Sequence, residues 1–186
     1  LGKDAFQETD IVGITLPITK MNYLVTDIRD LPRVVKEAYY IASTGRTGPV
    51  LIDITKDVQM KTISYEEFEE LFNEEINLPG YDPTYKGHRR QIEKAANLIN
   101  ESRKPLIIAG AGVLKAKAQQ ELYDIAKKAN IPVTNTLLGL GSFPGDDGLA
   151  LGMLGMHGTV YANYATDEAD LIIAMGIRFD DRITGD

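Results

Sequence analysis

Three short apolar runs separated by helix-like stretches constrain this chain more than any other feature. The runs extend from Pro105 to Ala109, from Ile131 to Thr136 and from Leu171 to Met175. Their near-continuous apolar character is typical of strands that are buried on both faces of a parallel sheet. The helices between them are predicted to cover those faces, so we expect an α/β fold with a parallel sheet flanked by helices. The helix expected before the first run places its apolar residues on one face: Ile92, Ala95, Ala96 and Ile99.

A smaller α/β unit is expected at the start of the chain. The β-branched stretch from Ile11 to Val25 has the composition of a strand, and Asp30 then caps an amphipathic helix with Pro32 in its first turn. Gly45 is expected to end that helix, and the run from Pro49 to Ile54 forms a further strand. The acidic, proline-containing stretch that follows predicts a linker before the larger unit.

Charge and composition exclude several classes of function. The chain carries 27 acidic and 20 basic residues, a net charge of −7, which disfavours a nucleic-acid partner because such binding needs a concentrated basic face. It has no cysteine and only two histidines, so we expect no metal site of thiolate or histidine type. No apolar run is long enough to span a bilayer. The absence of cysteine fits a reducing cytosol. Because the sequence begins with Leu1 and shows no signal pattern, we expect a segment of a longer cytoplasmic protein. An organelle of a plant or fungus stays open as an alternative location.

Glycine-rich turns follow the first two runs, and their role is open at this level. The turn Gly110 to Gly112 could let backbone N–H groups approach a phosphate or the edge of a flavin ring, but the third glycine of the usual fingerprint is absent. The turn Thr136 to Gly141 would lie at the same edge of a parallel sheet, where ligand crevices form. In both turns the alternative is that the glycines only allow the chain to reverse.

Two further groups of residues follow near the end of the chain. His157 precedes a helix, where it could act as an N-terminal cap or stack on a planar ligand. After the last run stands a cluster of charges, Arg178, Asp180, Asp181 and Arg182. Its arginines suit a carboxylate or a pyrophosphate, and the alternative is a set of salt bridges that satisfies itself.

Several runs of the sequence resemble the catalytic subunit of the biosynthetic, FAD-containing acetolactate synthase (acetohydroxyacid synthase) family. They are DAFQETDIV, GRTGPVLIDITKDVQ, TLLGLGSFPGD, LGMLGMHGTVYANYA and GIRFDDRITG, and the resemblance is collinear over essentially the whole chain. It implies that residues 1–58 are the C-terminal part of the thiamine pyrimidine-binding domain and that residues 59–87 are a linker. Residues 88–186 are then the central FAD-binding domain, truncated at its C-terminal end.

The resemblance also implies an activity and its cofactors. Enzymes of this family decarboxylate pyruvate on thiamine diphosphate and condense the two-carbon unit with pyruvate or 2-ketobutyrate, in the biosynthesis of valine and isoleucine. They use Mg²⁺ to hold the diphosphate, and their FAD has a structural role without net redox change. The implied partners are small 2-ketoacid substrates, further copies of the chain in a homo-oligomer, and a regulatory subunit.

Site residues are carried over by position. Residues that match the family's flavin site are Arg46, Gly110, Ala111, Gly112, Thr136, Leu137, Leu154, Gly155, Met156, His157, Gly176, Ile177, Arg178, Phe179 and Asp180. Ala111 departs from a family pattern that often has three glycines. Arg182 matches the arginine that receives the carboxylate of the second ketoacid, and Phe6, Gln7 and Lys56 match residues at the substrate channel.

The same resemblance places the remaining catalytic groups outside this sequence. The glutamate that activates the thiamine ring is expected upstream of Leu1, and the motif for the metal and diphosphate is expected downstream of Asp186. No complete catalytic set is therefore expected here, and the isolated chain is predicted to be inactive and to bind FAD weakly or not at all. The alternative function is a non-catalytic flavin- or nucleotide-binding or assembly module.

Overall fold

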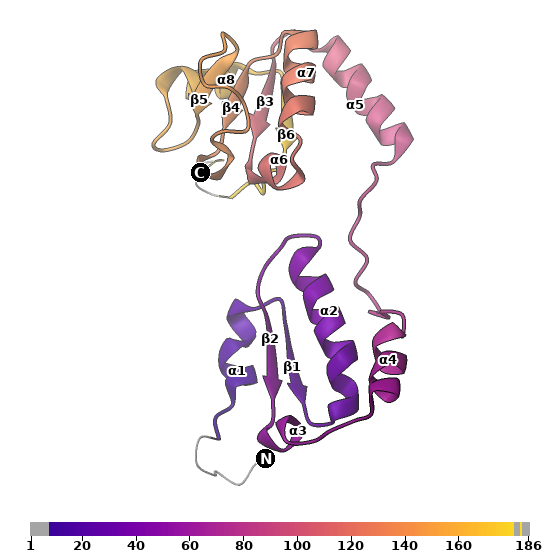
Figure 1. The fold of residues 1–186 in the computed structure, drawn as a ribbon. Coiled ribbons are helices and arrows are strands. Elements are labelled where there is room, and N and C mark those ends of the chain that lie inside the picture. Colours follow the sequence, from indigo (N-terminus) through magenta and orange to yellow (C-terminus); the bar gives the residue numbers. More distant parts are fainter. Residues whose placement is uncertain (1–7, 181–182, 184–186) are drawn as a thin grey trace. The chain divides into compact units, whose positions relative to one another are not determined.

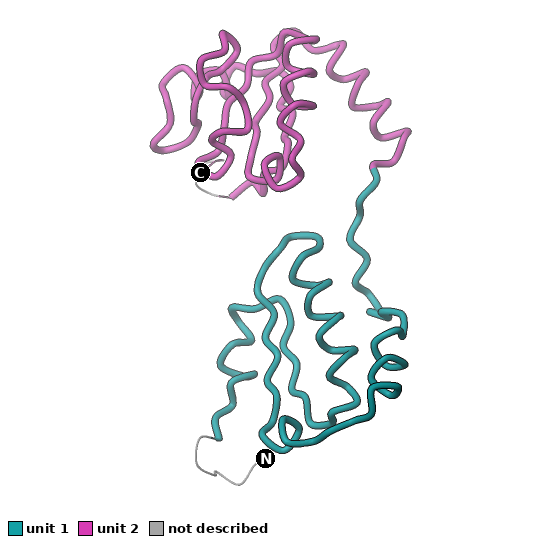
Figure 2. The backbone as a smooth tube through the Cα atoms, in the orientation of Figure 1, with its two compact units in different colours: residues 1–86 teal, residues 87–186 magenta. Residues whose placement is uncertain are grey.

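The computed structural model describes residues 8–180 and residue 183. The chain forms two compact units, which divide between Lys86 and Gly87 (Figure 2). Each unit contains a parallel sheet with helices beside it, so the predicted fold class is confirmed. Within the described residues no helix is both long enough and apolar enough to cross a membrane.

The first unit is built on a two-stranded sheet (Figure 1). β1 (Met21–Val25) and β2 (Val50–Ile54) pair in parallel, and α2 (Leu31–Ser43) connects them. The other elements of this unit are α1 (Ile11–Thr15), the 3-10 helices η1 (Leu16–Ile18) and η2 (Ile28–Asp30), α3 (Lys56–Gln59) and α4 (Tyr65–Asn73). A small core contains Val25 of β1, Val34 of α2 and Val58 of α3.

The prediction of one strand from Ile11 to Val25 was wrong for the residues before Met21. Only Met21–Val25 is a strand, whereas the residues before it form α1 and η1. The Asp10 carboxylate accepts a hydrogen bond from Gly13 N at 2.8 Å and so caps α1. A local side-chain bond of this kind outweighs the weak preference of β-branched residues for strands.

Charged side chains of the first unit hold the acidic stretch along α2. Arg29 Nε donates to Glu67 Oε1 of α4 at 2.8 Å. Lys36 Nζ donates to the carbonyl oxygens of Phe72 and Glu74, which end α4. Helix α4 is therefore held within the first unit, which extends to Lys86. The assignment of the two units to a pyrimidine-binding domain and a central domain stays a prediction.

The second unit contains a four-stranded sheet. Its strands are β3 (Pro105–Ala109), β4 (Val133–Asn135), β5 (Ala150–Met153) and β6 (Leu171–Met175), and all pairs are parallel in the order β5-β4-β3-β6. Its helices are α5 (Arg89–Glu101), α6 (Ala111–Ala116), α7 (Gln119–Ala129), η3 (Leu137–Gly139) and α8 (Val160–Glu168). Each of the three predicted runs contains a strand, although β4 covers only Val133–Asn135 of the run from Ile131 to Thr136. β5 is a further strand that was not predicted.

Alternate side chains of β3 pack on opposite faces of this sheet. Ile107 and Ala109 lie in a buried cluster with residues of α6, α7 and β4. Leu106 and Ile108 lie in a second cluster with Leu154 and Ala162, the latter from α8. This two-sided burial explains why the sequence of β3 is apolar without alternation, and it confirms that helices cover both faces.

Helix α5 differs from the prediction. It has no buried residue, and Ile92 on its expected apolar face is 59% exposed. Only Ile99, near its C-terminal end, packs against the core of the second unit among the four predicted residues. The C-terminal end of α5, before Ser102, lies near the sheet, and the rest of the helix projects away from it (Figure 1). The amphipathic pattern alone was therefore not enough to predict that this face is buried.

Asp170 fastens the start of β6 to the turn before β3. Its carboxylate accepts hydrogen bonds from the Ser102 hydroxyl, from Arg103 N at 2.8 Å and from Lys104 N at 2.9 Å. The Ser102 hydroxyl and these two N–H groups lower the pKa of Asp170 below its ordinary value of 3.8. A carboxyl group with a lowered pKa stabilises the folded state above the ordinary pKa, and this contribution is lost as the pH falls through the folded-state pKa.

We expect Asp170→Asn to lower the melting temperature of the chain at pH 7, with a smaller difference from the wild type at pH 3. The physical reason is that asparagine cannot supply the ionised acceptor for all three donors. Thermal unfolding monitored by circular dichroism between pH 3 and pH 7 measures the effect. Asp167→Asn, on the exposed surface of α8, is the matched control, and equal effects of the two substitutions would contradict the assigned role.

Candidate functional site

The loops after β3, β4 and β6 meet at one edge of the second unit's sheet. Thr136 N, after β4, donates to Ala109 O at the end of β3 at 2.9 Å. Gly110 N donates to Met175 O at 2.8 Å, at the end of β6. The predicted flavin residues that follow these three strands thus lie together where ligand crevices of parallel sheets form.

Glycine is required at this edge because the loops approach each other closely. A Cβ atom on Gly110 would lie 2.5 Å from Gly176 O, and one on Gly112 would lie 2.5 Å from Gly176 Cα. Gly176 itself has a φ of +66°, a conformation that side-chain-bearing residues rarely adopt. The interpretation of these glycines as structural turns is therefore supported by a specific contact between two loops.

Two of the three N–H groups in the Gly110 turn are already used inside the protein. Gly110 N donates to Met175 O, and Gly112 N donates to Gly176 O at 3.0 Å. Ala111 is the first residue of α6, where an N–H group has no partner within the helix. A ligand at this turn would meet the backbone surface and the Ala111 N–H rather than three converging donors.

The turn after β4 is held by a buried amide. Asn135 Nδ2 donates to Gly139 O at 3.0 Å and to Ser142 Oγ at 2.8 Å, and both Asn135 and Ser142 are buried. Thr136 is also buried, whereas Leu137 projects with 67% of its surface exposed. The sequence analysis missed the bond between Asn135 and Ser142, for which a polar residue ending an apolar run was the only signal.

The turn that carries Met156 and His157 is clamped by another asparagine. Asn163 Oδ1 accepts a hydrogen bond from Gly155 N at 2.8 Å, and Asn163 Nδ2 donates to Gly155 O at 3.1 Å. The Met156 and His157 side chains are exposed. The turn therefore presents these two side chains outward from a fixed backbone.

His157 does not cap α8, so that interpretation was wrong. The N-cap is Thr159, whose side chain accepts a hydrogen bond from Ala162 N at 3.2 Å. The Thr159 hydroxyl also donates to Leu151 O at 2.8 Å, which joins the helix to the start of β5. Threonine is a preferred N-cap residue, so Thr159 was the signal in the sequence for this cap.

The charged segment after β6 contains an internal ion pair. Arg178 Nη2 lies 2.8 Å from Asp180 Oδ2, and Arg178 Nε donates to the same oxygen at 2.9 Å. Between them Phe179 has a φ of +51°, and Ile177 packs against the Leu106 side of the core. For this pair the self-satisfied salt bridge is observed, while Arg182 lies outside the described residues.

The remaining predicted site residues belong to the first unit. Arg46 is exposed in the loop between α2 and β2, next to Gly45, which has a φ of +56°. Lys56 is exposed at the first position of α3. Phe6 and Gln7 lie outside the described residues. No group of three or more histidine, aspartate or glutamate residues that could hold a metal ion occurs in the described part of the chain.

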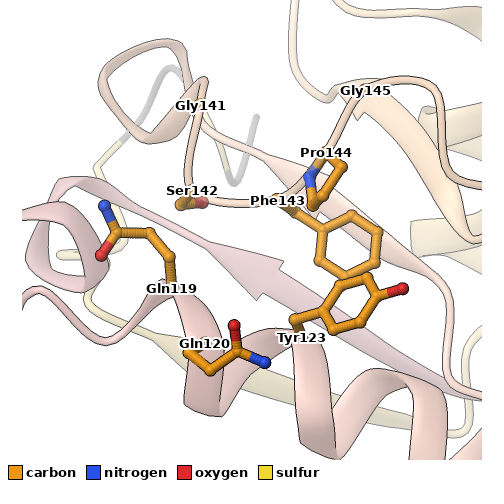
Figure 3. A pocket seen from close by; sticks show the side chains of 8 residues that line it. All are labelled: Gln119, Gln120, Tyr123, Gly141, Ser142, Phe143, Pro144 and Gly145. Carbon is orange, nitrogen blue, oxygen red and sulfur yellow. The ribbon is translucent and has the colours of Figure 1, made fainter.

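A separate hollow of about 470 Å³ lies between the start of α7 and the loop after η3. Figure 3 shows the rings of Tyr123 and Phe143 side by side in its wall, and their centroids are 5.7 Å apart. Its lining residues are Gln119, Gln120, Tyr123, Gly141, Ser142, Phe143, Pro144 and Gly145. None of them matches a residue of the family's flavin site, although Gly141 ends the glycine-rich turn that begins at Thr136. Gly112 and Gly176 instead border a second, mostly apolar hollow of about 410 Å³ beside α6 and α7.

The family model for the central domain of thiamine pyrophosphate enzymes matches residues 92–186, which are half of the chain. The chain belongs to the thiamine pyrophosphate enzyme family. Its resemblance to acetolactate synthases is confirmed over the full length. It is 51% identical over 186 residues to the acetolactate synthase large subunit of Corynebacterium glutamicum, covering 100% of this chain and 29% of that protein.

Relatives from other lineages give the same result. Acetolactate synthase 1, chloroplastic, of Zea mays is 50% identical over 187 residues, covering 100% of this chain and 28% of that protein. The acetolactate synthase large subunit of Cyanidium caldarium is 48% identical over 185 residues, covering 100% and 32%. This thiamine pyrophosphate family member thus spans less than a third of the length of these relatives.

The fold comparison agrees with the family. An X-ray structure from Mycobacterium smegmatis, described as that of a thiamin diphosphate-dependent enzyme, superimposes with a TM-score of 0.66 at 23% identity. The match covers 89% of this chain and 30% of that one. At this identity the likeness supports the fold of the thiamine pyrophosphate family member and no further detail of its site.

We expect Gly110→Ala to destabilise the second unit by about 1–3 kcal/mol, because the new methyl group would overlap the backbone of Gly176. Urea unfolding of the chain measures the change. Gly145→Ala is the matched control, since a Cβ there meets nothing within 4 Å. A loss of stability as small for Gly110→Ala as for the control would contradict the contact between the loops.

Proposed function

We propose that this chain is the central part of an acetolactate synthase that condenses pyruvate with a second 2-ketoacid on thiamine diphosphate. The observation that carries the proposal is about 50% identity, over the whole chain, to acetolactate synthases of a bacterium and a plant. The predicted flavin residues that follow β3, β4 and β6 gather at one sheet edge, which supports the proposal from the side of the structure.

The described residues fit FAD in some of its contacts. Arg46 offers an exposed guanidinium, which suits a pyrophosphate. Leu137 and Met156 offer exposed apolar side chains, and the glycine edge leaves backbone surface where a Cβ would not fit. In this proposal FAD is held as a structural group.

The described residues do not by themselves fit thiamine diphosphate and Mg²⁺, because they contain no cluster of carboxylate or histidine ligands. When bound, thiamine diphosphate supplies the electron sink for decarboxylation. We assign no step of that chemistry to the residues of this chain. Their proposed part is to hold the flavin and, through Arg182, Phe6, Gln7 and Lys56, to receive the ketoacids.

The direct test joins this segment to its native flanks and measures acetolactate formation from pyruvate with thiamine diphosphate, Mg²⁺ and FAD. We expect product from the joined protein and none from the 186-residue chain alone. Adding 2-ketobutyrate identifies the second ketoacid. A folded full-length protein that forms no acetolactate would refute the proposal.

In that full-length enzyme we expect Arg182→Ala to reduce condensation at least about ten-fold more than it reduces the release of carbon dioxide in the first step. The reason is that a charged hydrogen bond to the carboxylate of the second ketoacid is lost, while the first decarboxylation does not use it. Single-turnover release of labelled carbon dioxide, compared with the rate of product formation, separates the two steps. Arg90→Ala on the exposed face of α5 is the control, and an equal loss in both steps would remove this role from Arg182.

The second candidate function is a non-catalytic flavin-binding or assembly module. It is favoured because the predicted flavin residues of the second unit lie at one sheet edge, while the described residues contain no cluster of metal ligands. A melting shift with FAD but not with NAD, together with absence of acetolactate formation by the full-length protein, would support it over the synthase.

A further inference from the structure

Lys20 contacts the loop that carries Arg46. Its main-chain N donates to Pro49 O at 2.8 Å, at the end of that loop. Its side chain runs so close to Gly48 that a Cβ there would lie 3.2 Å from Lys20 Cγ and Cδ. The main chain and the aliphatic part of the Lys20 side chain therefore pack against the segment between α2 and β2.

The Lys20 ammonium group also holds the other end of this loop. Its Nζ donates to the carbonyl oxygens of Ile41 and Thr44, the latter at 2.9 Å, and to the Tyr81 hydroxyl at 3.1 Å. An ammonium group has three N–H donors, and these three oxygens can use all of them. Because the carbonyl groups belong to the C-terminal end of α2, the charge also interacts favourably with the helix dipole.

Tyr81 reaches the same place from the segment that precedes the second unit. A turn closed by the bond from Tyr81 N to Leu78 O at 3.1 Å, with Gly80 at a φ of +79°, directs the residue back to α2. The Tyr81 hydroxyl donates to Thr44 O at 3.0 Å and lies 2.9 Å from Thr44 Oγ1. The hydrogen bond with the Thr44 side chain is the largest effect that keeps the pKa of Tyr81 below its ordinary value, and the bond with the Lys20 side chain is the next largest.

Tyr81 also contacts the loop and the helix through its ring. The ring packs edge-on against Tyr40 with centroids 6.0 Å apart, and Lys20 Nζ lies 5.3 Å from the centroid of Tyr81. A Cβ on Gly45, the residue before Arg46, would lie 3.5 Å from the Tyr81 hydroxyl. The conformation of the loop is thus tied to a residue 35 positions further along the chain than Arg46.

These contacts have a feature that a purely structural role does not require. Within the described residues, the bonds of the Lys20 ammonium group and the Tyr81 hydroxyl go to Ile41 and Thr44, which enter the loop, or join the two groups to each other, and none goes to the strands of the sheet. The adjoining backbone bond from Gly48 N to Ala42 O, at 3.2 Å, closes the loop over them. Arg46 is exposed in this segment, two residues after Thr44 and two residues before Gly48, which these hydrogen bonds hold.

We propose that Lys20 and Tyr81 are positioning residues that hold the loop from Gly45 to Pro49 so that Arg46 meets the flavin pyrophosphate in one conformation. The inference rests on the proposed function, which makes Arg46 a contact of FAD. It adds that the segment around Tyr81 sets the affinity for the cofactor without touching it.

The test uses the full-length protein and a double-mutant cycle. Lys20→Met keeps most of the stem and removes the three donors, and Tyr81→Phe keeps the ring and removes the hydroxyl. We expect each to weaken FAD binding by about 3- to 30-fold, the effect of losing one or two net hydrogen bonds. Combined with Arg46→Ala, neither should cause a further loss, because residues that act through Arg46 have no effect once it is absent.

Hydrogen exchange gives a second readout that does not depend on FAD. We expect faster exchange of the Thr44 and Gly48 amides in both variants, at a melting temperature that stays near that of the wild type for Tyr81→Phe. Lys86→Met and Tyr39→Phe are the matched controls, since both side chains are exposed and should change neither exchange nor affinity.

The outcomes separate the inference from the function on which it rests. Wild-type FAD binding and its loss in Arg46→Ala test the proposed function without reference to Lys20. Additive losses in the double variants, or wild-type affinity in both Lys20→Met and Tyr81→Phe, would overturn the positioning role. If Lys20→Met fails to fold, the cycle with Tyr81→Phe decides the question by itself.

Discussion

The close packing of backbone against backbone at the ends of β3, β4 and β6 is the constraint on which the second unit depends. A parallel sheet brings its strand ends to one edge, and here the loops meet with no room for side chains at Gly110, Gly112 and Gly176. Hydrogen bonds between the loops satisfy backbone groups that would otherwise be buried without partners. The same packing determines the edge where the predicted flavin residues gather, so fold and candidate site share one cause.

This packing also changes what the glycine turn can contribute to ligand binding. Because Gly110 N and Gly112 N donate to carbonyl oxygens within the unit, they are not available to an anion. Arg178 is likewise paired with Asp180. The predicted flavin residues described in the second unit therefore include two exposed apolar side chains, Leu137 and Met156, and an arginine that is already paired.

Features that depend on local pattern could be predicted from the sequence, and features that depend on distant contacts could not. The run Pro105 to Ala109 is apolar throughout because both faces of β3 are buried, so its role in the sheet is visible in the composition. β5 was missed because it is short, contains Gly152 at a φ of +75° and pairs with β4 across a register irregularity. The sequence predicted the α5 helix but not the exposure of its apolar face. Burial of a helical face depends on what packs against it, which the local pattern does not specify.

The candidate site divides along the same line. Its position at the carboxyl ends of the strands follows from a parallel sheet and could be predicted. The bond between Asn135 and Ser142 joins residues seven apart, and the clamp of Gly155 by Asn163 joins residues eight apart, through turns whose geometry no composition rule specifies. Lys20 and Tyr81 are 61 residues apart in sequence, and no short motif connects them.

The acidic stretch has the composition of a solvated linker, yet one tyrosine in it completes the set of acceptors around a half-buried ammonium group. Composition describes the average environment of such a segment, whereas its proposed role depends on the contacts of one residue, which only the folded chain reveals.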